Sequence, residues 1–189
     1  MWREKSTGNL VKEGSSWVDT NGIRHPRNWD IWSADEKKAA GLEELTPEPI
    51  PNDATWWWTM GPDGKVTKKA KNLNDENVRD PDTGELKKDA KGNQVVQLGV
   101  KSVLINEVKH QQGSLLAKSD CAIIRKTDKG TAIPSNIQTW RDAIREKATE
   151  METAITNAAD ADAIEALFVV WDGEGNKSGI LYDWPELGS

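Results

Sequence analysis

The side chains that most often carry enzyme chemistry are few in this sequence. It contains two histidines, His25 and His110, and one cysteine, Cys121. Their positions do not match the spacing of a zinc site, and no phosphate-binding loop or nucleophile elbow occurs. His25 precedes Pro26 beside a turn, where a structural hydrogen bond is the expected role, and Cys121 is expected to be a small buried hydrophobe. We therefore expect no enzyme, no metal site and no cofactor.

Carboxylates are plentiful, but the pattern does not pair two of them for acid–base hydrolysis. The segment Asp80-Pro-Asp-Thr-Gly-Glu85 has the oxygen ligands of a calcium loop without the further spacing of an EF-hand, which favours a turn. Lysines of residues 65–71 follow three adjacent tryptophans, a combination that can bind an anionic polymer. Acidic residues come directly afterwards, and the formal net charge is −6. We therefore expect no nucleic-acid partner.

The composition predicts a small core and extended parts. Of the 189 residues, 36 % are hydrophobic and 30 % charged, which is little apolar material for one large core. The single cysteine excludes an internal disulfide and fits synthesis in a reducing cytoplasm. The charged start, residues 1–5, is unlike a signal peptide, and no apolar run approaches the roughly 20 residues of a membrane helix. We expect a soluble protein that does not enter a membrane.

Tryptophan is the unusual residue of this sequence. Ten tryptophans stand against one tyrosine and one phenylalanine, and most of them lie in the first sixty residues, where little else could form a core. Two interpretations stay open: the rings form the core of a small β-rich module, or some are exposed and bind a protein partner or stack on sugar rings. Adjacent tryptophans in a strand must point to both faces, so at least one should meet solvent or a partner. The partner-binding candidates are Trp56, Trp57, Trp58, Trp29 and Trp32.

The strongest structural signal lies in residues 133–158. Apolar side chains recur there at steps of three and four, which predicts an amphipathic helix with one apolar stripe. The segment 100–117 is the best partner, because it carries a matching apolar face that only Gln111 interrupts. We expect the two helices to pack antiparallel. The predicted core residues of the pair are Ile137, Trp140, Ile144, Met151, Ile155, Leu104, Val108 and Leu115.

Turn residues divide the rest of the chain into short elements. Asn21-Gly22 predicts a hairpin, Ser33 and Glu36 form a capping box for a short helix, and three prolines in residues 46–51 predict an extended linker. A strand, a tight turn and a second strand follow over residues 55–69. The segment 70–98 is polar, with weak strands at 85–88 and 94–98.

After the helical pair we expect a short helix over residues 160–168 and then a hairpin with strands at 168–171 and 180–182. The predicted fold class is α+β. Its expected parts are a Trp-rich β module with one short helix at residues 1–45, a Pro-rich linker and extended β-hairpin arm at 46–98, and a helical hairpin domain with a C-terminal β-hairpin at 99–189.

Two segments of the helical pair carry a family resemblance. Leu115-Leu-Ala-Lys-Ser-Asp120 ends the first helix, and Ala132-Ile-Pro134 with Trp140-Arg-Asp-Ala-Ile-Arg145 belongs to the second. These segments resemble the phage tail assembly chaperone-like family over roughly residues 105–147, about a quarter of the chain. Cys121 departs from the family, which usually has tryptophan at this position. The matching positions are Leu115, Leu116, Ser119, Asp120, Ile133, Pro134, Trp140, Arg141, Ile144 and Arg145.

The two ends of the chain are similar to small proteins encoded among the tail genes of marine phages. Residues 19–29 resemble the opening of those proteins and residues 180–186 their ending. The resemblance implies a non-enzymatic structural or adaptor protein of a phage tail, at the tail tip, baseplate or fibre attachment. It would reach the virion after assembly in the host cytoplasm, bind other tail or fibre proteins and be oligomeric in the assembly. Two alternatives stay open: a tail or tail-fibre assembly chaperone absent from the mature virion, and a Trp-based carbohydrate-binding module at the host surface.

Overall fold

The computed structural model describes residues 1–19, 21–61 and 63–187 and has an α+β fold, which confirms the predicted class. The chain divides into two compact units. Residues 1–53 and 57–69 form the first, and residues 54–56 with the chain from Ala70 onward form the second. The boundary between the units passes through a β-hairpin. The part expected at residues 46–98 is therefore divided between the two units.

The first unit is built of short elements. They are β1 (Trp2–Glu4), β2 (Leu10–Val11), β3 (Trp17–Val18), β4 (Arg24–His25), the 3-10 helix η1 (Arg27–Ile31), α1 (Ala34–Ala39), β5 (Leu42–Glu44) and most of the hairpin of β6 (Trp56–Met60) and β7 (Val66–Ala70). The strand β1 lies between β2 and β5, and β3 pairs with β4, all antiparallel. The capping box of α1 is present: Ser33 Oγ accepts from the Glu36 N–H, and the Glu36 carboxylate accepts from the Ser33 N–H.

Tryptophan rings form the core of this unit. Trp2 and Trp29 are buried with Val11 and Leu42, and two further rings, Trp17 and Trp32, pack against them. Each ring buries a large apolar area, so a few of them can hold together strands of two or three residues. Of the two interpretations that the sequence left open, the first applies to these rings: they form the core of a small module.

Several hairpin turns share one chemistry, in which an aspartate opens the turn and a glycine with positive φ closes it. At Asp89, Oδ1 accepts from the backbone N–H groups of Lys91 and Asn93, both at 2.8 Å, and Gly92 has φ 85°. Glycine adopts this φ without steric cost. The Asn93 side-chain amide and these N–H groups hold the pKa of Asp89 below its ordinary value. The turns that follow this scheme open at Asp19, Asp80, Asp89 and Asp172.

The second unit contains the long helices. Its elements are β8 (Glu76–Asn77), β9 (Val96–Gln97), α2 (Val100–Ala117), α3 (Asp120–Lys129), α4 (Ser135–Asn157), α5 (Ala161–Glu165), β10 (Val170–Trp171) and β11 (Lys177–Ser178). In the polar arm, β8 pairs with β9, and isolated bridges join Arg79 to Leu86 and Lys88 to Gln94. Among the described residues, no helix has both the length and the apolar character needed to cross a bilayer.

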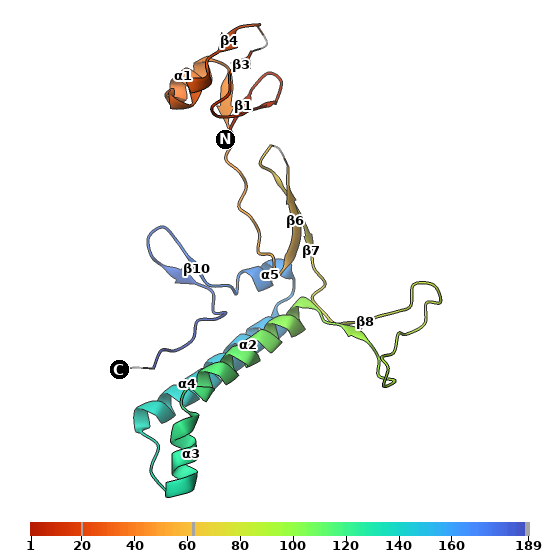
Figure 1. Cartoon of the computed structure of the whole chain (residues 1–189), viewed down its shortest axis with the longest axis vertical. Helices are drawn as coiled ribbons and strands as arrows, with labels where there is room; N and C mark the ends of the chain where they lie inside the picture. Colours follow the sequence, from red (N-terminus) through yellow and green to blue (C-terminus); the bar gives the residue numbers. More distant parts are fainter. Residues whose placement is uncertain (20, 62, 188–189) are drawn as a thin grey trace. The chain divides into compact units, whose positions relative to one another are not determined.

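The helices α2 and α4 form the expected helical hairpin (Figure 1). Its core joins Val100, Leu104 and Val108 of α2 to Ala148, Met151 and Ile155 of α4. Of the predicted core residues, Leu104, Val108, Trp140, Ile144, Met151 and Ile155 are buried. Ile137 and Leu115 are half-buried. The step pattern of the sequence thus identified the buried stripe of α4.

The structure corrects two expectations about the link between these helices. A separate helix, α3, follows α2, where the sequence predicted no helix, and Gly130 with φ 68° ends it. Cys121 lies on α3 and is exposed, whereas its neighbour Ala122 is buried. Successive helical residues are turned by about 100° from each other, so the buried face passes through Ala122 and leaves Cys121 outside.

The C-terminal hairpin is shorter than predicted. Its antiparallel strands are β10 and β11, close to the turn, and residues 180–182 do not continue this ladder: Leu181 forms an isolated parallel bridge with Phe168. Instead, the N–H groups of Ile180 and Leu181 donate to Leu167 O, each at 2.8 Å, and Leu181 is fully buried. Gly179 permits this fold-back, because a Cβ there would lie 2.1 Å from Phe168 O.

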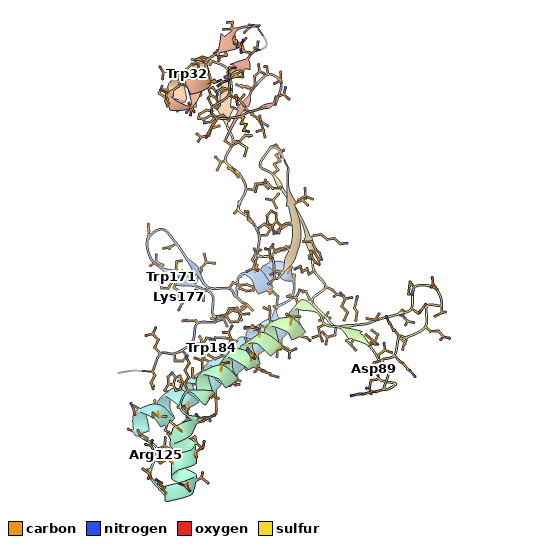
Figure 2. The ribbon with its side chains drawn as sticks, viewed as in Figure 1. Trp32, Asp89, Arg125, Trp171, Lys177 and Trp184 are labelled. Atoms are coloured by element: carbon orange, nitrogen blue, oxygen red, sulfur yellow. The ribbon has the colours of Figure 1, made fainter. Side chains whose placement is uncertain are left out.

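The segment after Leu181 lies along the helical hairpin. Trp184 Nε1 donates to Gln111 Oε1 at 2.7 Å, and Trp140 Nε1 donates to Pro185 O at 2.9 Å. Trp184 is labelled beside α2 in Figure 2. Gln111, which interrupts the apolar face of α2, therefore serves as the acceptor for an indole ring.

Candidate partner-binding site

The hairpin of β6 and β7 presents one exposed face. At its turn the Gly61 N–H donates to Lys65 O at 2.8 Å, which sets the antiparallel register of the strands. In this register Trp57 lies opposite Lys69, and opposite residues of an antiparallel pair point to the same side. The exposed side chains on this side are called the Trp57 surface: Trp57, Thr59, Thr67 and Lys69.

The three adjacent tryptophans of β6 have three different environments. Trp56 is 8 % exposed, and its Nε1 donates to Glu165 Oε2 of α5 at 2.9 Å. Trp58 is half-buried, and its Nε1 donates to the Asp53 carboxylate. Trp57, which points to the other side of the strand, is 65 % exposed. The expectation that at least one of these rings meets solvent is confirmed, and that ring is Trp57.

The structure removes two of the five partner-binding candidates. Trp56 and Trp29 are buried within the chain and cannot anchor a partner. Trp29 is fully buried, and its Nε1 donates to Ser15 O at 3.0 Å. Trp32 is half-buried, with its ring edge-on to that of His25 at 5.8 Å between centroids. Trp57 is the most exposed of the five candidates.

The hairpin is basic within an acidic chain. Residues 56–71 contain four lysines and one aspartate, a formal charge of +3, whereas the whole chain carries −6. Lys69 is exposed on the same side as Trp57. A ring with a cation and hydroxyl groups beside it can bury apolar area and pair with a carboxylate at the same contact.

The sequence analysis missed a second exposed tryptophan, Trp171 of β10. Its side chain is 64 % exposed, and Lys177 Nζ of β11 lies 5.6 Å from the ring centroid, a cation–π contact (Figure 2). Lys177 also forms an ion pair with Asp183. The alternation rule does not single out this ring, because both residues of β10 and both residues of β11 are exposed.

His25 and Asp19 form the closest arrangement to a catalytic pair. His25 Nε2 lies 3.1 Å from Asp19 Oδ2, both side chains are nearly buried, and the His25 ring stacks on Trp17 at 4.2 Å between centroids. A cavity of about 540 Å³ lies beside them and is also lined by Ser6. Ser6 Oγ donates to Glu4 Oε1 at 3.1 Å, so its proton is bound by a carboxylate. The backbone N–H of Ile23 holds the pKa of Asp19 below its ordinary value, which fits a turn-forming carboxylate.

A buried arginine joins the two segments that carry the family resemblance. Arg141 of α4 donates through Nη1 to Leu116 O at 2.8 Å, to Ser119 Oγ at 2.7 Å and to Asp120 Oδ1 at 2.8 Å. Its side chain is buried, whereas the Asp120 side chain is half-exposed. One guanidinium thus holds α4 to the junction between α2 and α3. The residues that match in the two segments therefore have a packing role, because they hold α4 against the end of α2 and the start of α3.

Within residues 1–19, 21–61 and 63–187, no three histidine, cysteine or acidic side chains are placed to hold a metal ion. Comparisons with protein-family models, with curated proteins and with solved structures find no match to this chain.

Proposed function

We propose that this chain is a non-enzymatic structural or adaptor protein of a phage tail, at the tail tip, baseplate or fibre attachment. The observation that carries the proposal is the set of hydrogen bonds by which Arg141 holds α4 to the junction between α2 and α3. Residues of both resembling segments, Leu116, Ser119 and Asp120 with Arg141, meet there through three hydrogen bonds. The residues that carry the resemblance thus share one structural role in this chain: they hold together a helical hairpin.

The surface of the chain supports a binding role. Its accessible surface is 12838 Å². Two separate compact proteins, together of the same 21.0 kDa, would expose about 10,900 Å². Strands β8, β9, β10 and β11 have no buried residue. Hairpins without a buried face are only marginally stable in water, so contact with neighbouring virion proteins would stabilise them.

Mass spectrometry of purified particles of the phage that encodes the chain tests this proposal. Peptides of the chain should be abundant in the particles, at a constant ratio to a known tail protein through successive purification steps. Peptides present in infected cells but absent from particles would contradict the structural role. They would favour the alternative, a tail or tail-fibre assembly chaperone that leaves before the virion is complete.

The Trp57 surface also favours a second candidate function, carbohydrate binding at the host surface. Thr59 and Thr67 are exposed on the same side of the hairpin as this ring, and a ring with hydroxyl groups on one side suits a sugar. A glycan array with the wild-type chain and with Trp57→Ala separates the two functions. Saccharide-specific binding that the substitution removes would favour the carbohydrate role, and an array without specific binding would reject it.

A further inference from the structure

The outer side of α4 carries a groove of about 680 Å³. The groove is shallow and open to solvent, so it suits a side chain of another protein better than an enclosed small ligand. Short and apolar side chains line most of it, together with two carboxylates. The lining residues are Thr149, Thr153, Ala154 and Ile180, with Glu146 and Glu150. The groove thus offers an apolar surface beside negative charge.

The two carboxylates of the groove lie one turn apart on the same side of α4. Glu150 pairs with Lys147 at 2.9 Å, whereas the described residues provide no ion pair for Glu146. Like charges four residues apart repel each other. A cation brought by a binding partner would relieve this repulsion and gain a charge-assisted hydrogen bond.

We propose that the Trp57 surface of one copy docks in the α4 groove of a second copy. The Trp57 ring would cover the apolar lining, and Lys69, which lies opposite Trp57 in the hairpin, would pair with Glu146. This inference deepens the proposed function, because it names one partner of the Trp57 surface. The donor and acceptor surfaces are different, so the contact is heterologous and copies join head to tail into a ring or a chain.

Charge favours the Trp57 surface over the other exposed tryptophan as the occupant. The Trp57 surface carries the cation Lys69, opposite in sign to the carboxylates of the groove. The hairpin of residues 169–179 contains Asp172 and Glu174 against Lys177, a formal charge of −1. The cation beside Trp171 is Lys177, which is already paired with Asp183, so this ring brings no unpaired cation toward Glu146 and Glu150. Complementary charges align partners and exclude wrong ones.

The area involved predicts a weak contact. One tryptophan buries about 150–250 Å², and stable interfaces bury roughly 1,200 Å² or more in total. We therefore expect a dissociation constant between about 10 μM and 1 mM in solution. Contacts within a ring or with other virion proteins would strengthen it by avidity.

Analytical ultracentrifugation of the full-length chain over about 10–500 μM tests the docking. The weight-average mass of the wild type should rise above 21.0 kDa with concentration, and added salt should weaken the association. Trp57→Ala should remain at the mass of one chain, and so should the double variant Glu146→Lys with Glu150→Lys. Trp171→Ala is the matched control, since it removes an equally exposed ring, and should associate as the wild type does. Circular dichroism verifies that every variant is folded.

A mixture of the two defective variants gives the sharper test. The Trp57→Ala chain keeps an intact groove, and the Glu146→Lys, Glu150→Lys chain keeps an intact Trp57 surface. Mixing them should therefore produce 1:1 pairs that grow no further. The proposal is overturned if the wild type stays monomeric, if Trp57→Ala associates normally, or if the mixture forms no pairs.

The outcomes also separate this inference from the proposed function. A chain that stays monomeric in solution and is nevertheless abundant in particles would reject the self-docking and leave the tail role standing. A chain that associates through Trp57 but is absent from particles would reject the structural tail role and leave the self-docking standing.

Discussion

Replacing Trp140 with alanine tests how the helical hairpin is held together. Trp140 is 7 % exposed, and a buried tryptophan removes about 150–250 Å² of surface from water. At about 25 cal/mol per Å², this area corresponds to roughly 4–6 kcal/mol, of which alanine retains a part. Measured truncations of core aromatic residues cost about 3–5 kcal/mol. We expect Trp140→Ala to lower the free energy of unfolding by this amount.

The conservative variant Trp140→Phe isolates the polar contribution. Phenylalanine keeps most of the apolar burial but loses the hydrogen bond from Nε1 to Pro185 O. Pro185 is a half-buried residue, so we expect its carbonyl oxygen to bind water in this variant. A loss of about 1–2 kcal/mol is therefore expected, from one hydrogen bond and a smaller ring.

Urea titration followed by far-UV circular dichroism measures both variants, because the helical signal comes mainly from the second unit. Hydrogen exchange of residues 181–187 supplies an independent readout. Both variants should exchange faster there than the wild type, since each loses the bond to Pro185. A free energy of unfolding that changes by less than about 0.5 kcal/mol in Trp140→Ala would place the ring at the surface and refute the packing described for α4.

Three further outcomes are expected. Arg141→Met should lower the free energy of unfolding by about 1–3 kcal/mol, because Ser119 and two other acceptors lose one shared donor; urea titration beside an Arg145→Met control measures it. The amide NMR signal of Asn176 should shift with a midpoint below about pH 3.9. The hydrogen bonds to Asp172 lower the pKa of its carboxyl group. They are fully present above the ordinary pKa and are lost as the pH falls through the lowered pKa. An Asn176 midpoint at or above that pH would contradict the turn. Residues 76–97 should exchange fast in the free chain and be protected in purified particles, because few of their side chains are buried; equal protection in both states would contradict a role in wrapping a neighbour.

Local signals in the sequence determined several of the regular elements, although not α3. The step pattern of residues 133–158 predicted α4 and its buried stripe, because a helix repeats every 3.6 residues and one face must leave water. Ser33 and Glu36 predicted the start of α1 through groups three residues apart. Asn21-Gly22 predicted a hairpin for the same local reason, since the required φ is a property of the residue itself.

Long-range contacts determined whether each side chain is buried or exposed and which partner it binds. Trp56, Trp57 and Trp58 are the same residue type, yet Trp56 Nε1 donates to Glu165 of α5, whereas Trp57 is exposed. The partners of Arg141 lie more than twenty residues away, and no local rule selects them. Alternation and periodicity say which residues share a face, but only tertiary structure says which face another element covers. For this reason the sequence by itself determined the helical pair and the presence of an exposed ring, and the tertiary structure decided that this ring is Trp57.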